Sequence, residues 1–305
     1  MKYKQSIYNP DFIRDSSEKK KHTRSMKAVS RIGTGATYTI LVIISFIWLI
    51  PFVYLLLQSF AVKFEPSDFI PSKWTFDNYV SLFTNKTYPF WKWYLNSFII
   101  AVVTTIFQSI LVLLTSYSLS RLRFKGRKAI MNLMLILGMF PGFLGMICIY
   151  NILKLFCGGN EPSIFSIILI YCANSAMSYY IAKGFFDTIP KSLDEAVRID
   201  GGNNNTVFWK VIVPMSKPII IYTILISFTS PWGDFMLASM LAGLNTSNWT
   251  VAVGLQKLIN TLGNETLYFP TFCAGGVVVS IPIMALFFWL QRYYVEGIAG
   301  GAVKG

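Results

Sequence analysis

Apolar residues are concentrated in six long runs, which polar or Gly/Asn/Pro-bearing connections separate. The first run, residues 36–60, holds no charged side chain over 25 positions. A helix rising about 1.5 Å per residue would therefore cross a hydrocarbon core about 30 Å thick. The run is also longer than the apolar region of a typical signal peptide, which is the alternative interpretation. The other runs cover residues 96–119, 129–153, 162–182, 218–241 and 271–290. The pattern predicts an all-α, polytopic membrane protein with six transmembrane helices.

The composition supports a membrane protein and argues against metal sites and histidine-based catalysis. Apolar residues make up 54% of the chain and charged residues 13%, and the mean hydropathy is +0.52. The one histidine, His22, lies in a polar basic segment, which argues against a His-based metal site or catalytic relay. The four cysteines show no CxxC spacing, so we expect free buried thiols and no bound metal.

The positions of lysine and arginine predict the orientation of the chain. Of the 27 positive residues, 21 lie in the N-terminal segment, after the second and fourth runs, and after the sixth. Positive residues are retained on the cytoplasmic side during insertion, so both termini are predicted to be cytoplasmic. The formal charge of +13 is therefore a topology signal, and we expect membrane lipid rather than nucleic acid as its partner.

This orientation predicts five parts of the chain. They are a basic cytoplasmic tail (1–35), a first transmembrane helix (36–60), an extracytoplasmic loop (61–93), a transmembrane core (94–291) and a cytoplasmic C-terminal tail (292–305). The first tail is expected to be flexible through residue 31, because it has no hydrophobic periodicity. The extracytoplasmic loop contains Trp74, Trp91 and Trp93, which suit the membrane interface.

The connection at residues 184–217 is amphipathic but too polar to cross a membrane. Ser192, with Glu195 three positions later, matches a capping box and predicts the start of a short helix. Asp194 and Arg198 are spaced for an ion pair between positions i and i+4. One apolar stripe on this helix is predicted from Leu193, Ala196 and Val197.

Glycine and proline predict how this connection continues. Gly201 and Gly202 follow the first short helix, and glycine readily takes the left-handed conformation that ends helices. A second short helix, which stops before Pro214, is predicted from Phe208, Trp209, Val211 and Ile212. We call this predicted helix-turn-helix at residues 184–217 the finger.

Two roles are open for such a finger. It could lie flat on the membrane surface as an interfacial helix. Its three acids, Asp194, Glu195 and Asp200, would then face anionic headgroups, so docking to a soluble protein is at least as reasonable.

The finger carries a recognisable motif. Glu195, Ala196 and Val197, followed by Gly201 and by Val211, Val213 and Pro214, resemble the EAA signature of ABC importer permeases. Together with the C-terminal QRYYVEGIAGGAVKG, the run resembles the MalG-type subunit of carbohydrate importers, including the maltodextrin and galacto-oligosaccharide branches. Val197 replaces the second alanine of the signature, and Val211 and Val213 replace its Ile and Leu. All three exchanges are between small or apolar residues.

The resemblance implies a MetI-like ABC permease fold in which the finger is the coupling helix of an oligosaccharide importer working by alternating access. Glu195 would be the charged contact with the ATPase, Ala196 and Val197 would allow close approach, Gly201 would make the turn, and Pro214 would end the finger. The chain has no GxxxxGK[ST] loop, so it would bind no cofactor itself, and ATP and Mg would bind the partner. The implied partners are a second, MalF-type permease, two ATPase copies and an extracytoplasmic solute-binding protein.

Several polar residues in or near the spans are further candidates. Asp234 lies in the fifth run, where it could line the translocation path or contact the partner permease. In this family the loop between the fifth and sixth helices, here residues 242–270, can reach the binding protein, so its Asn245, Asn248 and Trp249 are candidate contacts. Interhelical hydrogen bonds are expected from Gln108, Asn132 and Asn174.

Two alternatives to a sugar permease stay open. The chain could be an ABC permease for a non-sugar solute, or it could be a stand-alone secondary carrier. A carrier would want ion-coupling carboxylates or broken helices near the midplane, and among the runs only Asp234 offers such a carboxylate. An integral-membrane enzyme is disfavoured, because no run holds a histidine or paired carboxylates.

Overall fold

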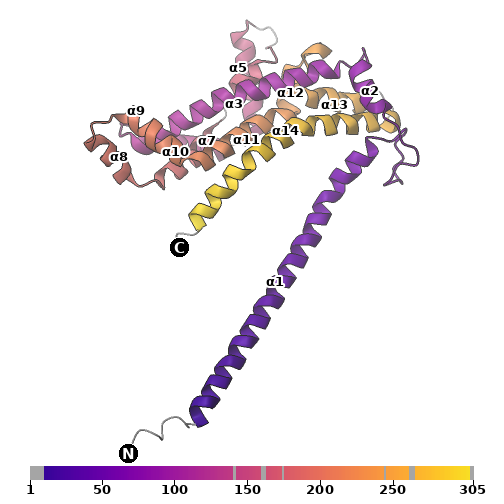
Figure 1. The fold of residues 1–305 in the computed structure, drawn as a ribbon. Helices are drawn as coiled ribbons and strands as arrows, with labels where there is room; N and C mark the ends of the chain where they lie inside the picture. The colour runs from indigo at the N-terminus through magenta and orange to yellow at the C-terminus, as the bar shows by residue number, and fades with distance from the viewer. Residues whose placement is uncertain are drawn as a thin grey trace, which may run out of the picture. The chain divides into compact units, whose positions relative to one another are not determined.

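The computed structural model describes residues 10–139, 142–158, 163–173, 175–243, 245–260 and 265–302 (Figure 1). Within these ranges the chain is helical and forms no β-strand beyond an isolated bridge between Ala61 and Trp74. The all-α prediction is therefore confirmed. The chain divides into two compact units, one ending at Leu55 and one beginning at Leu56.

The first helix is longer than the sequence pattern predicts. Helix α1 runs from Pro10 to Gln58, so the helix begins 26 positions before residue 36. The predicted flexible tail is wrong from residue 10 onward, and residues 1–9 lie outside the described part. Residues 18–28 include four lysines together with Glu18, Met26 and Ala28, and these residue types favour a helix even without an apolar face. Its apolar portion exposes side chains such as Trp48 along its length, which suits lipid.

Among the residues that the structure describes, three helical segments are long and apolar enough to cross a membrane by themselves: residues 34–58 of α1, α3 (Phe90–Arg121), and residues 266–293 of α14 (Glu265–Ala302). A fourth is obtained only if residues 204–215 and α11 (Lys217–Gly233), which meet at 78°, are one bent span. The described residues therefore do not confirm the prediction of six transmembrane helices.

The other three predicted spans are built from shorter helices. Residues 129–153 divide into α4 (Arg127–Met139) and α5 (Gly142–Phe156), and Pro141, which cannot donate a helical hydrogen bond, stands between them in the sequence. The fourth run divides into α6 (Ser166–Ala173) and α7 (Ala176–Asp187). The fifth run divides into α11 and α12 (Met236–Leu241), because Asp234 takes an extended backbone conformation.

Two predicted loops contain helices. The loop at 61–93 includes α2 (Asp77–Thr84) and the start of α3. The loop at 242–270 includes a 3₁₀ turn (Thr246–Asn248), α13 (Val251–Asn260) and the start of α14. These connections are therefore folded structure rather than open loops.

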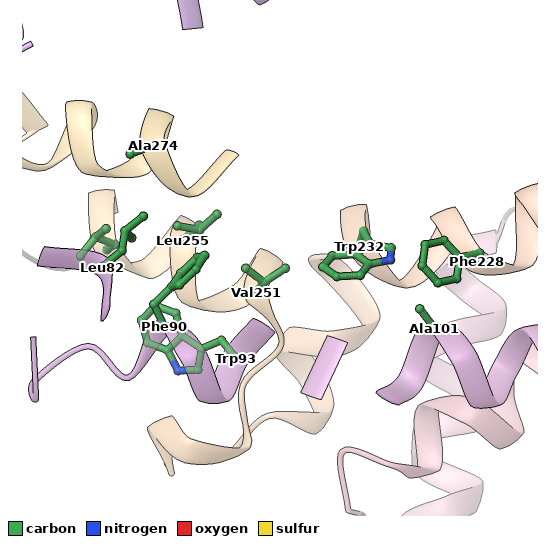
Figure 2. Packing of buried hydrophobic residues seen from close by; sticks show 10 residues of the cluster. Leu82, Phe90, Trp93, Ala101, Phe228, Trp232, Val251, Leu255 and Ala274 are labelled. Carbon is green, nitrogen blue, oxygen red and sulfur yellow. The ribbon is translucent and has the colours of Figure 1, made fainter. Parts of the chain in front are cut away.

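Helices α3, α11 and α14 pack side by side and form the centre of the second unit (Figure 1). Figure 2 shows part of the apolar core, with Phe90 and Trp93 beside Leu255, and with Phe228 beside Trp232 farther along. The predicted interfacial position of Trp93 is wrong: its side chain is 1% exposed, and its Nε1 donates a hydrogen bond to the Thr246 carbonyl at 2.7 Å. Its aromatic surface is covered by α13 instead of facing the membrane interface.

Trp93 also requires a glycine on α13. A Cβ added to Gly254 would lie 2.0 Å from Cε3 of Trp93. We therefore expect Gly254→Ala to destabilise the protein by about 1–3 kcal/mol, because the indole must shift within a close-packed core. The measurement is the midpoint of thermal unfolding in detergent. Gly145→Ala is the matched control, since its Cβ would meet nothing within 4 Å, and an equal fall in both midpoints would contradict the prediction.

Candidate functional site

The finger is a helical hairpin at one end of the second unit (Figure 1). It contains α8 (Lys191–Ile199), α9 (Asn204–Val207), a π-helical turn (Phe208–Ile212) and α10 (Val213–Met215). Gly201 has φ +82° at the turn between α8 and α9. The amide of Gly202 donates to the carbonyl of Val197 at 2.8 Å and closes the end of α8. The predicted glycine stop is therefore confirmed.

The capping of the two finger helices differs from the prediction. The residue before α8 is Pro190, and no side chain caps that helix, so Ser192 lies inside it and forms no capping box. The capping box belongs to α9, where Asn203 Oδ1 accepts from the amide of Thr206 at 3.0 Å. Pro214 does not end the finger either. It lies at the start of α10, where a missing N–H costs little.

Asp194 is buried on the inner side of α8 and pairs with a residue of α3 instead of with Arg198. Its Oδ2 lies 3.2 Å from Nε of Arg121, the last residue of α3. The predicted pair with Arg198 is wrong, because Arg198 donates from Nη2 to Oδ1 of Asn204 at 2.7 Å. Asp194 points toward the unit and Arg198 toward the second arm of the hairpin, although they share the predicted spacing.

The end of α3 holds the finger through further hydrogen bonds. The hydroxyl of Tyr117 donates to the carbonyl of Asn204 at 2.8 Å, and Ser120 Oγ donates to Oδ1 of Asp187 at 2.6 Å. Burial alone would raise the pKa of the Asp187 carboxyl, but the hydrogen bonds from Lys183 and Ser120 outweigh it and lower that pKa. Asp187 is therefore charged at neutral pH.

Apolar side chains complete the attachment. A buried cluster joins α3, α7, the second arm of the finger and α11, through Val112, Tyr117, Ala182, Phe186, Ile189, Val207, Phe208, Ile212 and Ile219. The rings of Tyr117 and Phe208 meet edge to face with centroids 5.0 Å apart. The finger is thus fixed to the helix ends by packing as well as by hydrogen bonds.

The outer face of α8 is free of such contacts. Glu195 and Ala196 are exposed, Leu193 is 37% exposed and Ile199 is 86% exposed. The predicted stripe of Leu193, Ala196 and Val197 therefore does not face the core. Only Val197 is half-buried, against Gly202. This outer face presents one carboxylate among small and branched apolar side chains.

A cleft of 560 Å³ opens between the end of α3 and α8. Its lining includes four basic side chains and two acidic ones: Arg121, Arg123, Lys191, Arg198, Asp194 and Glu195. The cleft is therefore positive overall, although the exposed Glu195 of α8 also reaches its lining.

The remaining candidates make contacts within the chain. Asp234 Oδ1 accepts from the amide of Leu237 at 3.0 Å and so caps α12, while Oδ2 accepts from the hydroxyl of Tyr171 at 2.7 Å. No local pattern indicates Tyr171 as the partner of Asp234, since the two residues are 63 positions apart. The neighbouring Trp232 Nε1 finds no hydrogen-bond partner among the described residues.

In the segment after α12, Asn245 Oδ1 accepts from the amide of Ser247 at 3.0 Å, and the ring of Trp249 packs on Trp93. Asn248 is exposed. None of these contacts tests whether the three residues bind another protein, so that stays a prediction.

The predicted polar links between spans are confirmed for Gln108. Its Nε2 donates to the Tyr171 carbonyl at 3.2 Å and to Ser175 Oγ at 2.7 Å, at the break between α6 and α7. Asn174 lies outside the described residues. The side chain of Gln108 thus satisfies polar groups that an unbroken helix would have satisfied itself.

The chain belongs to the family of binding-protein-dependent transport system inner membrane components, whose model matches residues 112–300. It is 36% identical to the galactooligosaccharides transport system permease protein GanQ of Bacillus subtilis, over 83% of this chain and 90% of that protein. It is 32% identical to the maltodextrin transport system permease protein MalD of Streptococcus pneumoniae, over 92% and 99%.

A solved structure gives the same fold. A chain of a bacterial ABC transporter involved in the import of the acidic polysaccharide alginate superposes with a TM-score of 0.68 at 24% identity. The match covers 87% of this chain and 97% of that one. The predicted permease fold is therefore confirmed at the level of architecture.

Gly202 is a finger residue that the motif did not single out. A Cβ at this position would lie 2.5 Å from Cγ1 and 2.8 Å from the carbonyl oxygen of Val197. We expect Gly202→Ala to loosen the hairpin and to lower the unfolding free energy by about 1–3 kcal/mol. Limited proteolysis between α8 and α9 is the measurement. Gly184→Ala, whose Cβ would meet nothing within 4 Å, should be cleaved like the unmodified protein, and equal cleavage of both variants would refute the prediction.

Proposed function

We propose that this chain is a permease subunit of an ATP-driven oligosaccharide importer and that the finger at residues 184–217 docks a cytoplasmic ATPase subunit. The observation that carries this proposal is the outer face of α8. It exposes Glu195 and the apolar Ile199 on a hairpin that the end of α3 holds firmly. An exposed apolar side chain on a fixed, sharply turned element suits a protein partner.

The charge bias supports a cytoplasmic finger. Under the predicted topology the finger lies on the same side as the two termini and the basic segment that follows α3. Six crossings are compatible with only three continuous spans, because broken helices are tolerated in a membrane where neighbouring helices cover them. Gln108 and Tyr171 supply such contacts at two of the breaks.

The relatives support the substrate class. GanQ and MalD are named for galacto-oligosaccharides and maltodextrin, so we propose an oligosaccharide of the malto or galacto type as the cargo. ATP and Mg would bind the separate ATPase. The proposed assembly has a second permease, two ATPase copies and an extracytoplasmic binding protein, and a related alginate importer was solved with a periplasmic protein. Asn245, Asn248 and Trp249 are proposed contacts of the binding protein.

A stand-alone secondary carrier is less well supported. Asp234 lies at a helix break, as a carrier would require, but its two oxygens already accept hydrogen bonds from Leu237 and Tyr171. The Asp234 carboxylate therefore has a structural role in these two hydrogen bonds. A carrier would transport without a nucleotide-binding partner, so copurification separates the two functions.

Reversing the charge of Glu195 tests the docking role. We expect Glu195→Lys to reduce the copurified ATPase subunit by about tenfold, because the outer face of α8 would then carry the wrong sign for its partner. The measurement is the ratio of ATPase to permease after affinity purification from membranes. Glu65→Lys is the matched control, since Glu65 is exposed, lies outside the finger and undergoes the same charge change. A Glu195→Lys protein that keeps a full complement of ATPase would overturn the assignment.

A further inference from the structure

Helix α3 and the finger are joined by a buried ion pair. The Arg121 side chain is 2% exposed and that of Asp194 is 11% exposed, with Nε and Oδ2 3.2 Å apart. Nη2 of Arg121 also donates to the carbonyl of Ile189, just before α8, at 2.8 Å. One guanidinium at the end of a membrane-spanning helix therefore holds both the entrance to α8 and its first turn.

Stability alone does not explain this pair. Apolar residues of similar volume often replace a buried ion pair without loss of stability. Among the described residues, moreover, Nε and Nη1 of Arg121 and Oδ1 of Asp194 make no hydrogen bond, so the two side chains meet as a charge pair only, which is costly in a buried site. What the pair does supply is a link between two elements: the opposite charges attract α8 to the end of α3, and the hydrogen bond from Nη2 to the Ile189 carbonyl fixes the direction of the guanidinium.

Neighbouring hydrogen bonds also join the end of α3 to the finger. Tyr117, one turn before Arg121 on α3, bonds to Asn204 of α9, and Ser120 bonds to Asp187 at the end of α7. The covalent route from the finger to α11, by contrast, bends by 78°. The direct mechanical connection of the finger is therefore to α3.

We propose that Arg121 is a positioning residue that makes α3 move with the finger when the ATPase closes. This inference rests on the proposed coupling function of the finger. Docking occurs on the outer face of α8, and Arg121 transmits the resulting displacement from its inner face. The pair should therefore be dispensable for ATPase binding and needed for transport.

The test uses the whole importer in lipid vesicles, with its ATPase and binding protein. Asp194→Asn removes the charge of one partner, and Asp194→Glu restores it. We expect Asp194→Asn to bind the ATPase and hydrolyse ATP at the unmodified rate but to take up about tenfold less oligosaccharide per ATP, the scale of a typical coupling between sites. Asp194→Glu should recover most of the uptake.

A second variant separates transmission from folding. Arg121→Met combined with Asp194→Leu keeps the volume and removes the buried charges, so it should fold even if Asp194→Asn does not. A merely structural role predicts normal uptake per ATP in this double variant, and that result would overturn the inference. Uncoupled hydrolysis would support it.

Two comparisons complete the design. Glu65→Gln removes the charge of an exposed residue outside the finger and its attachment to α3, so uptake per ATP should stay unchanged. If the unmodified chain copurifies with no ATPase, the proposed function fails. If it does copurify and every pair variant transports normally, only the role of Arg121 fails.

Discussion

The structure depends on one constraint, which is that backbone hydrogen bonds must be satisfied wherever no water is available. Continuous helices such as α3 meet it by themselves, but the shorter helices leave polar groups at their ends. At the break between α11 and α12, the carboxylate of Asp234 accepts a backbone amide. At the break between α6 and α7, Gln108 donates to a carbonyl and to Ser175. These side chains allow the permease fold to interrupt its helices.

The sequence pattern predicted the helical class, the glycine turn of the finger and the family, because these depend on local residue types. It could not predict where the long apolar runs break. The run at 218–241 carries one charged residue, Asp234, at its break, and the hydroxyl that satisfies this carboxylate belongs to Tyr171, which is distant in the sequence. The helix that begins at Pro10, within the basic stretch before residue 36, was not predicted, because this part of the chain has no apolar periodicity.

The finger itself illustrates the same limit. Its motif identified Glu195 and Gly201, but the spacing of Asp194 and Arg198 was misleading, since the i, i+4 rule ignores competing partners on other elements. Arg121 is 73 positions from Asp194, and no local pattern connects them. Gly202 could have been found, because two consecutive glycines after a helix suggest that the second also lacks room for a side chain.

Two surfaces of α8 thus serve different purposes. The outward one exposes Glu195 and apolar side chains, where we propose that the ATPase docks, while the inward one holds Asp194 against α3. Neighbouring residues, Asp194 and Glu195, carry the same charge and point to different surroundings. A short amphipathic helix can in this way contact two bodies at once without being buried by either.

The 78° angle between the finger and α11 has a geometric consequence. A straight connection would pass a push along its own axis, so that α11 could only slide. At a 78° corner, little of a push along the second arm of the hairpin would run along the axis of α11, so the contacts with the end of α3 offer the more direct route.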